Sequence, residues 1–192
     1  MKRLVLASGS PYRKALLARL CLPFETLSPE VDETPHAGEG AVDLVRRLAL
    51  SKAHAGAAAR PDGLIIGCDQ CAVRDAAILG KPGRFEAAFE QLKGAAGRTV
   101  FFHTGLCLLD ASTGATQLEE IRVTVYFRKL GDHQIRAYLT KESPYSCAAS
   151  FMSEGLGIAL VERIDSDDPT ALIGLPLISL VTMLARTGVE VI

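Results

Sequence analysis

A segment near the start of the chain, residues 8–14 (SGSPYRK), combines small residues with two adjacent positive charges. A short apolar run, LVLA, precedes it, and a helix is expected to begin inside it, with Ser10 as the N-cap and Pro11 in the first turn. The free N–H groups at the start of a helix attract anions, and the planar guanidinium of Arg13 matches phosphate oxygens. The segment therefore indicates a phosphate site, with a plain capped turn as the alternative.

Asp69 is the sharpest candidate for acid–base chemistry, because it follows a continuous apolar run (LIIGC) that is typical of a buried parallel strand. Open α/β sheets bind their ligands where such strands end. A carboxylate at that place suits a general base, and a turn-capping aspartate is the alternative. The next residue, Gln70, offers a hydrogen-bond donor and an acceptor, which suits recognition of a nucleotide base and equally suits an ordinary loop.

Three carboxylates lie close together in the segment PEVDET, namely Glu30, Asp32 and Glu33. Carboxylates near phosphates are typical ligands of magnesium or manganese, because hard cations prefer oxygen. A solvated acidic loop is the alternative, since charged loops are ordinary surface features.

Two isolated lysines could add positive charge to a phosphate site. Lys52 lies four residues after Leu48, on or beside the apolar stripe of an expected helix, and there its amine either serves a site or extends to water. Lys81 lies between Gly80 and Pro82, which restrict the backbone and give its amine a defined place.

The elements that must position these residues alternate between apolar runs and helical periods, which predicts an α/β domain. A Ser/Gly-rich patch covers residues 146–157. We expect helices over 41–59, from Phe85 to near Gly94, over 132–141, and from Pro176 to near Gly188, and strands over 4–7, 64–68 (ending at Asp69), 100–109, 118–127 and 158–162.

Length and composition predict one domain. A chain of 192 residues with 48% hydrophobic content can fill one hydrophobic core and is short for two ordinary domains. The 21 basic side chains nearly balance the 22 acidic ones, so the net charge of −1 excludes a general attraction to nucleic acid or to an anionic membrane. No apolar run reaches signal-peptide or membrane-spanning length, and we therefore expect a cytoplasmic protein. The five cysteines are odd in number and widely spread, which favours reduced thiols over disulfides.

Eight motifs along the chain together resemble those of the Maf family of nucleoside triphosphate pyrophosphatases. In order they are SGSPYRK, PEVDET, ALSKA with Lys52, GCDQ, GKP, FHTG, SFMSEG and DPTALIGLP. The resemblance covers essentially the whole chain and implies a single domain over residues 1–192. It also implies a fold in which a mixed, twisted sheet flanked by helices forms two lobes around a central cleft.

The resemblance also implies a role for each matching residue. Asp69 is the expected proton acceptor, Glu33 the expected metal contact, and the expected substrate contacts are Ser8, Ser10, Arg13, Lys52 and Lys81. Tyr12, Gln70 and Glu154 are similar to the specificity residues of the 7-methyl-GTP pyrophosphatase subfamily, whereas the dTTP/UTP subfamily has Arg, Thr and Gln there. A methylated guanine is positively charged, which suits an aromatic ring and a nearby carboxylate.

The activity that the resemblance implies is hydrolysis of the α–β phosphate bond of 7-methyl-GTP, or of a related modified nucleotide, to the monophosphate and pyrophosphate. It implies a divalent cation, Mg²⁺ or Mn²⁺, and a homodimer. The alternatives are a dTTP/UTP pyrophosphatase and a non-catalytic nucleotide-binding protein that inhibits septum formation. Two residues depart from the family pattern: Tyr12 replaces the Trp of close relatives, and Ala149 replaces the Gly that is usual before Ser150.

Overall fold

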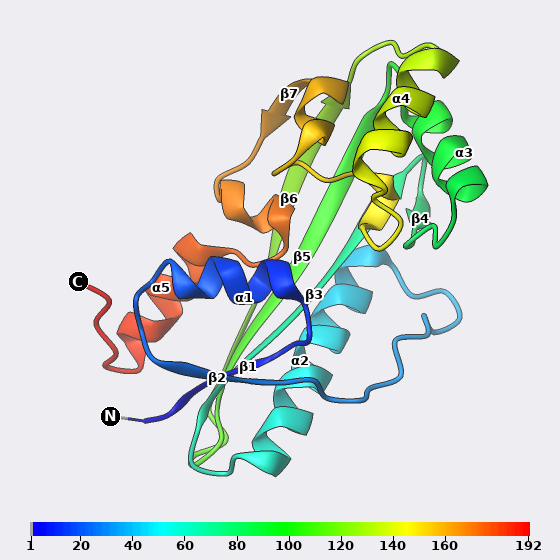
Figure 1. Cartoon of the computed structure of the whole chain (residues 1–192). Helices are drawn as coiled ribbons and strands as arrows, with labels where there is room; N and C mark the ends of the chain where they lie inside the picture. The colour runs from blue at the N-terminus through cyan, green and yellow to red at the C-terminus, as the bar shows by residue number, and fades with distance from the viewer. Residues whose placement is uncertain (1) are drawn as a thin grey trace. The chain divides into compact units, whose positions relative to one another are not determined.

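The structure is a computed structural model that describes residues 2–192, in which the chain forms five α-helices and a seven-stranded mixed sheet (Figure 1). The strand order is β2-β1-β3-β5-β6-β7, and β4 pairs with β3. The strands are β1 (Leu4–Ala7), β2 (Phe24–Leu27), β3 (Leu64–Arg74), β4 (Ala77–Leu79), β5 (Thr99–Asp110), β6 (Thr116–Phe127) and β7 (Val161–Asp165). The helices are α1 (Pro11–Ala18), α2 (Ala41–Ala59), α3 (Phe85–Ala95), α4 (Asp132–Glu142) and α5 (Leu177–Arg186), with 3₁₀ helices η1 (Ala148–Ser150), η2 (Leu156–Leu160) and η3 (Pro169–Ile173).

The chain divides into two compact units. The first contains the residues up to Gln70, then Thr104–Ile121 and Asp168–Ile192. The second contains Cys71–His103 and Arg122–Asp167. Strands β3, β5 and β6 each contribute residues to both units.

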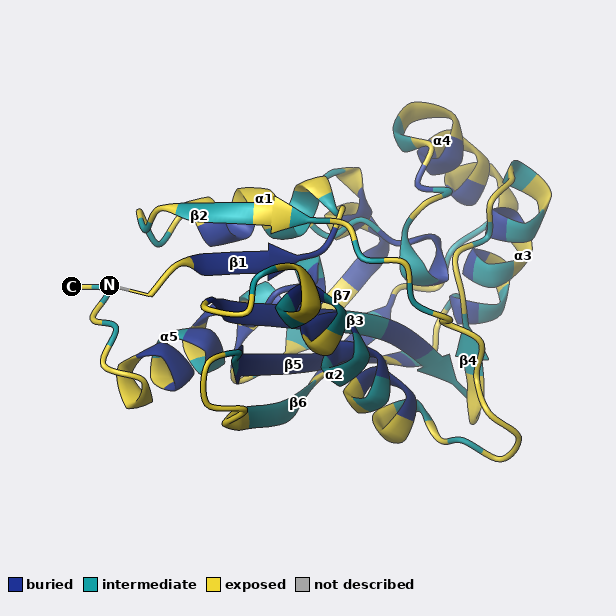
Figure 2. Ribbon diagram, turned by 90° about the horizontal axis from the view of Figure 1, so that it is seen from below, coloured by how far each residue is buried: buried dark blue, intermediate teal, exposed yellow. Residues whose placement is uncertain are grey.

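In the first unit, β1 lies between β2 and β3 and is parallel to both. Its side chains alternate between two separate parts of the core: Leu4 and Leu6 pack with residues of α1 and α5, whereas Val5 and Ala7 pack with residues of α2. Both faces of β1 are therefore covered, which is why its sequence is apolar at every position. Figure 2 shows β1 buried along its length, while β2 is partly exposed.

Two glycines allow α2 to approach the sheet closely. A Cβ atom at Gly67 of β3 would lie 2.0 Å from Ala49 O, and one at Gly105 of β5 would lie 2.2 Å from Val45 O. No other residue type fits at this distance, so the helix backbone packs directly on the strands. This contact brings the inner face of α2 onto the strand that carries Asp69.

The second unit is organised around α3, α4 and the ends of the long strands. Strand β4 pairs antiparallel with the end of β3, and β7 pairs antiparallel with β6. Three phenylalanine rings pack together in its core: Phe151 lies 5.9 Å from Phe102 and 5.2 Å from Phe127, measured between ring centroids. Such tilted and edge-on pairs are favourable ring geometries.

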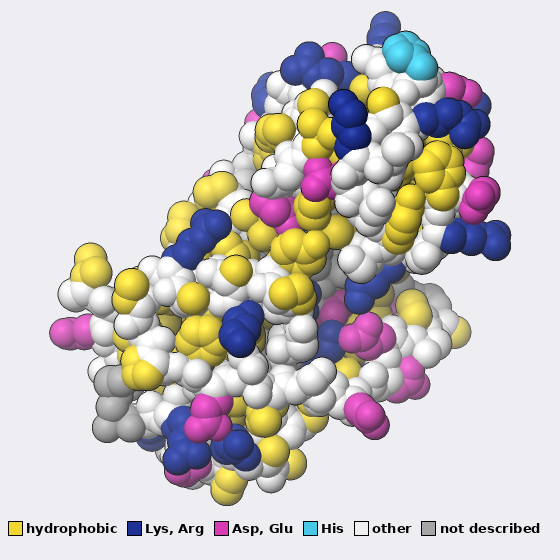
Figure 3. Space-filling view, in the orientation of Figure 1, with side chains coloured by type: hydrophobic (Ala, Val, Ile, Leu, Met, Phe, Trp, Pro, Cys, Tyr) yellow, Lys and Arg dark blue, Asp and Glu magenta, His cyan; other side chains and the backbone are white. Residues whose placement is uncertain are grey.

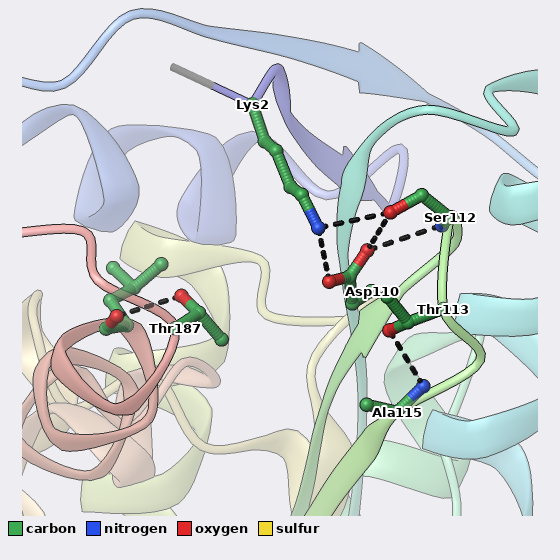
Figure 4. A network of polar contacts seen from close by, with 7 residues as sticks. Lys2, Asp110, Ser112, Thr113, Ala115 and Thr187 are labelled. Atoms are coloured by element: carbon green, nitrogen blue, oxygen red, sulfur yellow. Dashed lines mark hydrogen bonds and ion pairs between the residues drawn. The ribbon is translucent and has the colours of Figure 1, made fainter.

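The turn between β5 and β6 is held by the side chain of Asp110 (Figure 4). Its carboxylate accepts hydrogen bonds from the Lys2 amine and from the Ser112 hydroxyl and N–H. The Lys2 ammonium and these hydrogen bonds hold the pKa of Asp110 well below its usual value. The connection between β5 and β6, residues 111–115, is too short for a crossover, so these neighbouring strands run antiparallel.

Charged side chains of both signs are scattered over the face shown in Figure 3, in keeping with the net charge of −1. Within residues 2–192, every helix is too short or too polar to cross a membrane. No disulfide joins any of the five cysteines within residues 2–192. Burial raises the pKa of Cys68 to about 11, so this thiol is protonated at neutral pH.

Most of the expected elements are confirmed, and the helix over 41–59 matches α2 at both ends. Two expectations are wrong. The strand predicted to end at Asp69 continues to Arg74, because its last residues pair with β4. The strand predicted over 158–162 is mostly the 3₁₀ helix η2, and pairing with β6 begins only at Val161.

Candidate active site

The loop between β1 and α1 has the features of an anion-binding site: a capped helix N-terminus, a buried hydroxyl and a guanidinium. Ser10 is the N-cap of α1, and its hydroxyl accepts a hydrogen bond from Arg13 N at 3.4 Å, while Pro11 occupies the first turn. Ser8 is buried, and its hydroxyl oxygen accepts from Ser10 N at 3.2 Å and from Arg13 Nη1 at 3.3 Å. These bonds leave the Ser8 proton to donate to a ligand. Tyr12 lies half-buried in the same first turn.

The Arg13 side chain is fixed by a backbone carbonyl rather than by a carboxylate. Its Nε donates to Gly174 O at 2.9 Å, and it forms no ion pair with any residue in the range 2–192. The same carbonyl accepts from Cys68 Sγ at 3.0 Å. Since Cys68 directly precedes Asp69, the turn at Gly174 joins the arginine to the strand that carries the candidate base. A fixed guanidinium without an acidic partner is suited to bind phosphate.

Lys52 lies between two carboxylates. Its Nζ is 2.6 Å from Asp69 Oδ1 and 2.5 Å from Glu33 Oε1. The Lys52 and Asp69 side chains are only 9% and 14% exposed, whereas Glu33 is 53% exposed. The other oxygen of Asp69 has no partner among the described residues and is reached by solvent. Asp69 can therefore pair with Lys52 through one oxygen and accept a hydrogen bond from a water molecule through the other.

A second ion pair orders the loop that presents Glu33. Arg47 of α2 binds Glu39 with two hydrogen bonds, Nε to Oε1 at 2.6 Å and Nη2 to Oε2 at 2.8 Å. The same Nη2 donates to Thr34 O at 3.1 Å, and Glu39 also accepts from His36 N at 2.9 Å. The Arg47 hydrogen bonds and the His36 N–H lower the pKa of Glu39 to about 2. The residue after Glu33 is thereby anchored to α2.

Both N–H donors of the Gln70 side-chain amide form hydrogen bonds within the first unit. Its Nε2 lies 3.0 Å from Thr104 Oγ1, 2.8 Å from Ala171 O and 3.1 Å from Leu172 O. Thr104 is fully buried and donates its own proton to Ala171 O at 3.0 Å. Two carbonyls around one end of the amide identify that end as the NH₂ group. The amide oxygen of Gln70 has no partner among residues 2–192 and is accessible, so it is the end available to a ligand.

Asp168 holds together the turn that supplies these carbonyls. It is buried, and its carboxylate accepts from Thr170 N and Oγ1 at 3.1 and 2.7 Å, and from Ile178 N and Ser179 N at 2.7 and 3.3 Å. A carboxylate at the start of α5 also interacts favourably with the helix dipole. Asp168 therefore connects η3 to α5, and η3 in turn fixes Arg13 and Gln70.

The structure brings eight of the predicted site residues into the first unit, whereas Lys81 and Glu154 lie in the second. Lys81 is exposed in the loop before α3, and it forms no ion pair among the described residues. Glu154 is exposed in a turn before η2, and its carboxylate accepts from Ser153 Oγ at 3.3 Å. Thr104, Asp168 and Arg47 also support the site, and none of them is among the predicted site residues. Only Asp168 had a local signal, since Asp-Pro-Thr is typical of a capped helix start.

Glu33 and Asp69 are the residues that could hold a divalent cation. Within residues 2–192, no group of three His, Cys, Asp or Glu side chains is arranged to bind a metal ion. Magnesium, however, is commonly held by one or two carboxylates together with phosphate oxygens of a substrate. Two carboxylates that converge on the ammonium of Lys52 fit a cation of this kind, which would arrive with a phosphate-bearing ligand.

Comparisons with known proteins show the family to which the chain belongs. The family model described as Maf-like protein matches residues 3–187. A relative from Thiobacillus denitrificans is 54% identical over 189 residues, covering 98% of this chain and 94% of its own. Relatives from Methylobacillus flagellatus and Pseudomonas aeruginosa are 52% and 51% identical, and each alignment covers 100% of both chains. All three relatives are named 7-methyl-GTP pyrophosphatase.

Proposed function

Because this chain belongs to the Maf family, we propose that it is a nucleoside triphosphate pyrophosphatase that hydrolyses 7-methyl-GTP, or a related modified nucleotide, to the monophosphate and pyrophosphate. The names of relatives that are 51–54% identical over nearly the whole chain support this activity and substrate. The observation that carries the proposal is the nearly buried pair of Asp69 and Lys52, together with the guanidinium of Arg13 in the same unit, which has no acidic partner among the described residues.

In the proposed reaction, Asp69 orients a water molecule through its accessible oxygen and accepts a proton from it as the water oxygen bonds to the α-phosphorus. Lys52 orients the Asp69 carboxylate and offsets negative charge that develops on the phosphate oxygens. Arg13 and the hydroxyl of Ser8 bind phosphate, and Lys81 remains a predicted phosphate contact. The bond between the α-phosphorus and the bridging oxygen then breaks, and pyrophosphate leaves.

A divalent cation, when bound with the substrate, supplies further positive charge to the phosphate oxygens. Glu33 and Asp69 are the residues that would hold it. We expect turnover to require added Mg²⁺ or Mn²⁺ and to stop when a chelator is present. The homodimer and the cytoplasmic location stay predictions.

The proposed base preference rests on Tyr12, Gln70 and Glu154. Guanine presents N–H donors on its pairing edge, which suits the exposed amide oxygen of Gln70. Methylation at N7 makes the ring cationic, which suits the aromatic face of Tyr12 and the carboxylate of Glu154. The three residues together are expected to favour 7-methyl-GTP over UTP and dTTP, whose rings carry no positive charge.

The test is pyrophosphate release from 7-methyl-GTP, GTP, UTP, dTTP and CTP by the purified protein with magnesium. We expect 7-methyl-GTP to have the highest kcat/KM. Inactivity on all five would reject the enzymatic function, and a preference for UTP and dTTP would reject the substrate. Asp69→Asn separates an enzyme from a nucleotide-binding protein, because it removes the base and nearly keeps the shape. The enzyme should lose most turnover and still bind nucleotide.

A further inference from the structure

A chain of side-chain hydrogen bonds in the second unit ends at the loop that carries Lys81. Ser150 Oγ donates to Gln91 Oε1 at 2.6 Å, and Gln91 Nε2 donates to Gly80 O at 3.0 Å. Because both ends of the Gln91 amide are used, its orientation is fixed. The carbonyl of Gly80 belongs to the peptide group that leads into Lys81, so Gln91 holds the backbone immediately before the lysine.

The far end of this chain is a buried and strained turn. Ala149 and Ser150 both have left-handed backbone conformations, with φ of 53° and 58°, and Ser150 is fully buried. Tyr138 Oη donates to Ser150 O at 3.3 Å and accepts from Met152 N at 3.1 Å. L-residues adopt this conformation at a cost, and such strain persists only where the surroundings hold it. The turn therefore presents the Ser150 hydroxyl to Gln91 from a fixed position.

Gln91 is also fixed through its own backbone. Its carbonyl accepts from Arg74 Nη1 at 3.1 Å, which anchors α3 to β3. At the other end of the loop, Gly83 N donates to Tyr145 O at 3.0 Å. The loop that contains Lys81 is thus held on both sides, although the lysine itself is exposed and lacks an acidic partner among the described residues.

We propose that Gln91 is a positioning residue for Lys81, and that it transmits the fixed geometry of the Ser150 turn to the lysine backbone. This inference rests on the proposed function, in which Lys81 contacts the phosphates of the substrate. An exposed lysine on a mobile loop would lose much conformational freedom on binding phosphate, whereas a loop ordered in advance loses less. Removal of the Gln91 amide should therefore weaken the contribution of Lys81 without changing the lysine.

The test is a double-mutant cycle with the wild-type chain, Gln91→Met, Lys81→Ala and the double variant. We measure kcat and KM for 7-methyl-GTP with magnesium. We expect Gln91→Met to lower kcat/KM about tenfold in the wild-type background and to have little effect once Lys81 is alanine. Gln117→Met is the matched control, because Gln117 Nε2 also donates to a backbone carbonyl, Met183 O at 2.9 Å, but in the first unit.

Equal losses from Gln91→Met in both backgrounds would overturn the inference, since Gln91 would then act independently of Lys81. If Gln91→Met does not fold, Gln91→Glu replaces it, because glutamate keeps the acceptor for Ser150 and lacks the donor for Gly80. The same four proteins are also compared in their affinity for inorganic triphosphate, measured by calorimetry. If the wild type turns over no nucleotide, the proposed function fails, and the binding cycle alone tests the role of Gln91. Non-additive losses of triphosphate affinity would support the inference. Additive losses, or no binding by the wild type, would overturn it.

Discussion

Lys52 Nζ lies 2.6 Å from Asp69 Oδ1, so the ammonium of α2 and the carboxylate of β3 form a nearly buried ion pair. Glu33 approaches the same ammonium from an exposed loop. One ammonium thus pairs with two carboxylates, and the cluster contains one more carboxylate than ammonium groups. That excess of carboxylates would favour the divalent cation that we propose to bind there.

Lys52→Met is expected to lower kcat/KM for 7-methyl-GTP by about 100-fold, because removal of one preorganised positive group usually costs turnover on that scale. The two carboxylates would also repel each other without the ammonium. Steady-state kinetics measures the loss, with Lys141→Met as a control at an exposed lysine of α4. Unchanged kinetics in Lys52→Met would contradict a role for this pair in the reaction.

Thr104→Val should relax the choice of base more than it slows the reaction. The substitution keeps the shape but removes the hydroxyl that fixes the Gln70 amide, and it leaves the buried Ala171 carbonyl with one donor fewer. The free energy of unfolding should fall by about 1–3 kcal/mol, measured by urea denaturation. The kcat/KM ratio of 7-methyl-GTP to CTP should decrease, and Thr104→Ser should restore it. A ratio that stays constant would show that Gln70 does not depend on Thr104.

The ion pair of Glu39 and Arg47 makes a pH-dependent contribution to stability. The folded pKa of Glu39 is lowered from 4.5 to about 2, so its contribution is complete above pH 4.5 and is lost as the pH falls toward 2. We expect Glu39→Gln to lower the melting temperature at pH 7 and to differ less from the wild type as the pH falls below 4.5. Glu162→Gln is the control, at an exposed glutamate of β7. A difference that is constant with pH would contradict the prediction.

Ala149→Gly should stabilise the chain. Ala149 is buried with φ of 53°, a conformation that glycine adopts without steric cost. Since that cost is larger than the entropy glycine adds to the unfolded chain, the free energy of unfolding should rise by about 0.5–1 kcal/mol. Chemical denaturation measures the change. Ala148→Gly, at the preceding residue, is the control, and it should not raise the free energy of unfolding.

Asp168→Asn is expected to disturb the site from a distance. The carboxylate accepts from four donors, and an amide NH₂ at one of its oxygens would face an N–H group instead. The loss should be about 2–3 kcal/mol in the free energy of unfolding. Because η3 fixes Arg13 and Gln70, KM for 7-methyl-GTP should also rise at temperatures where the variant is fully folded. An unchanged KM would restrict Asp168 to a structural role.

The sequence by itself determined the elements whose causes are local. Ser10 and Pro11 predict the start of α1, and the spacing of apolar residues predicts both ends of α2, because capping and helical periodicity depend on neighbouring residues. The resemblance to the Maf family, read from eight short motifs, is confirmed by the family match. The C-terminal end of β3 and the start of β7 could not be predicted, since these ends depend on pairing with β4 and β6.

Only the tertiary structure decided what the site residues do to one another. In the sequence, Lys52 was also compatible with a side chain that extends to water. The fold places it between Glu33 and Asp69 because Gly67 and Gly105 let α2 pack directly on the sheet. Gln70 could have offered either end of its amide. Carbonyls about a hundred positions away in the chain, in η3, take its donors and leave the oxygen for a ligand. Such constraints arise from packing between distant segments, which no local pattern of residues records.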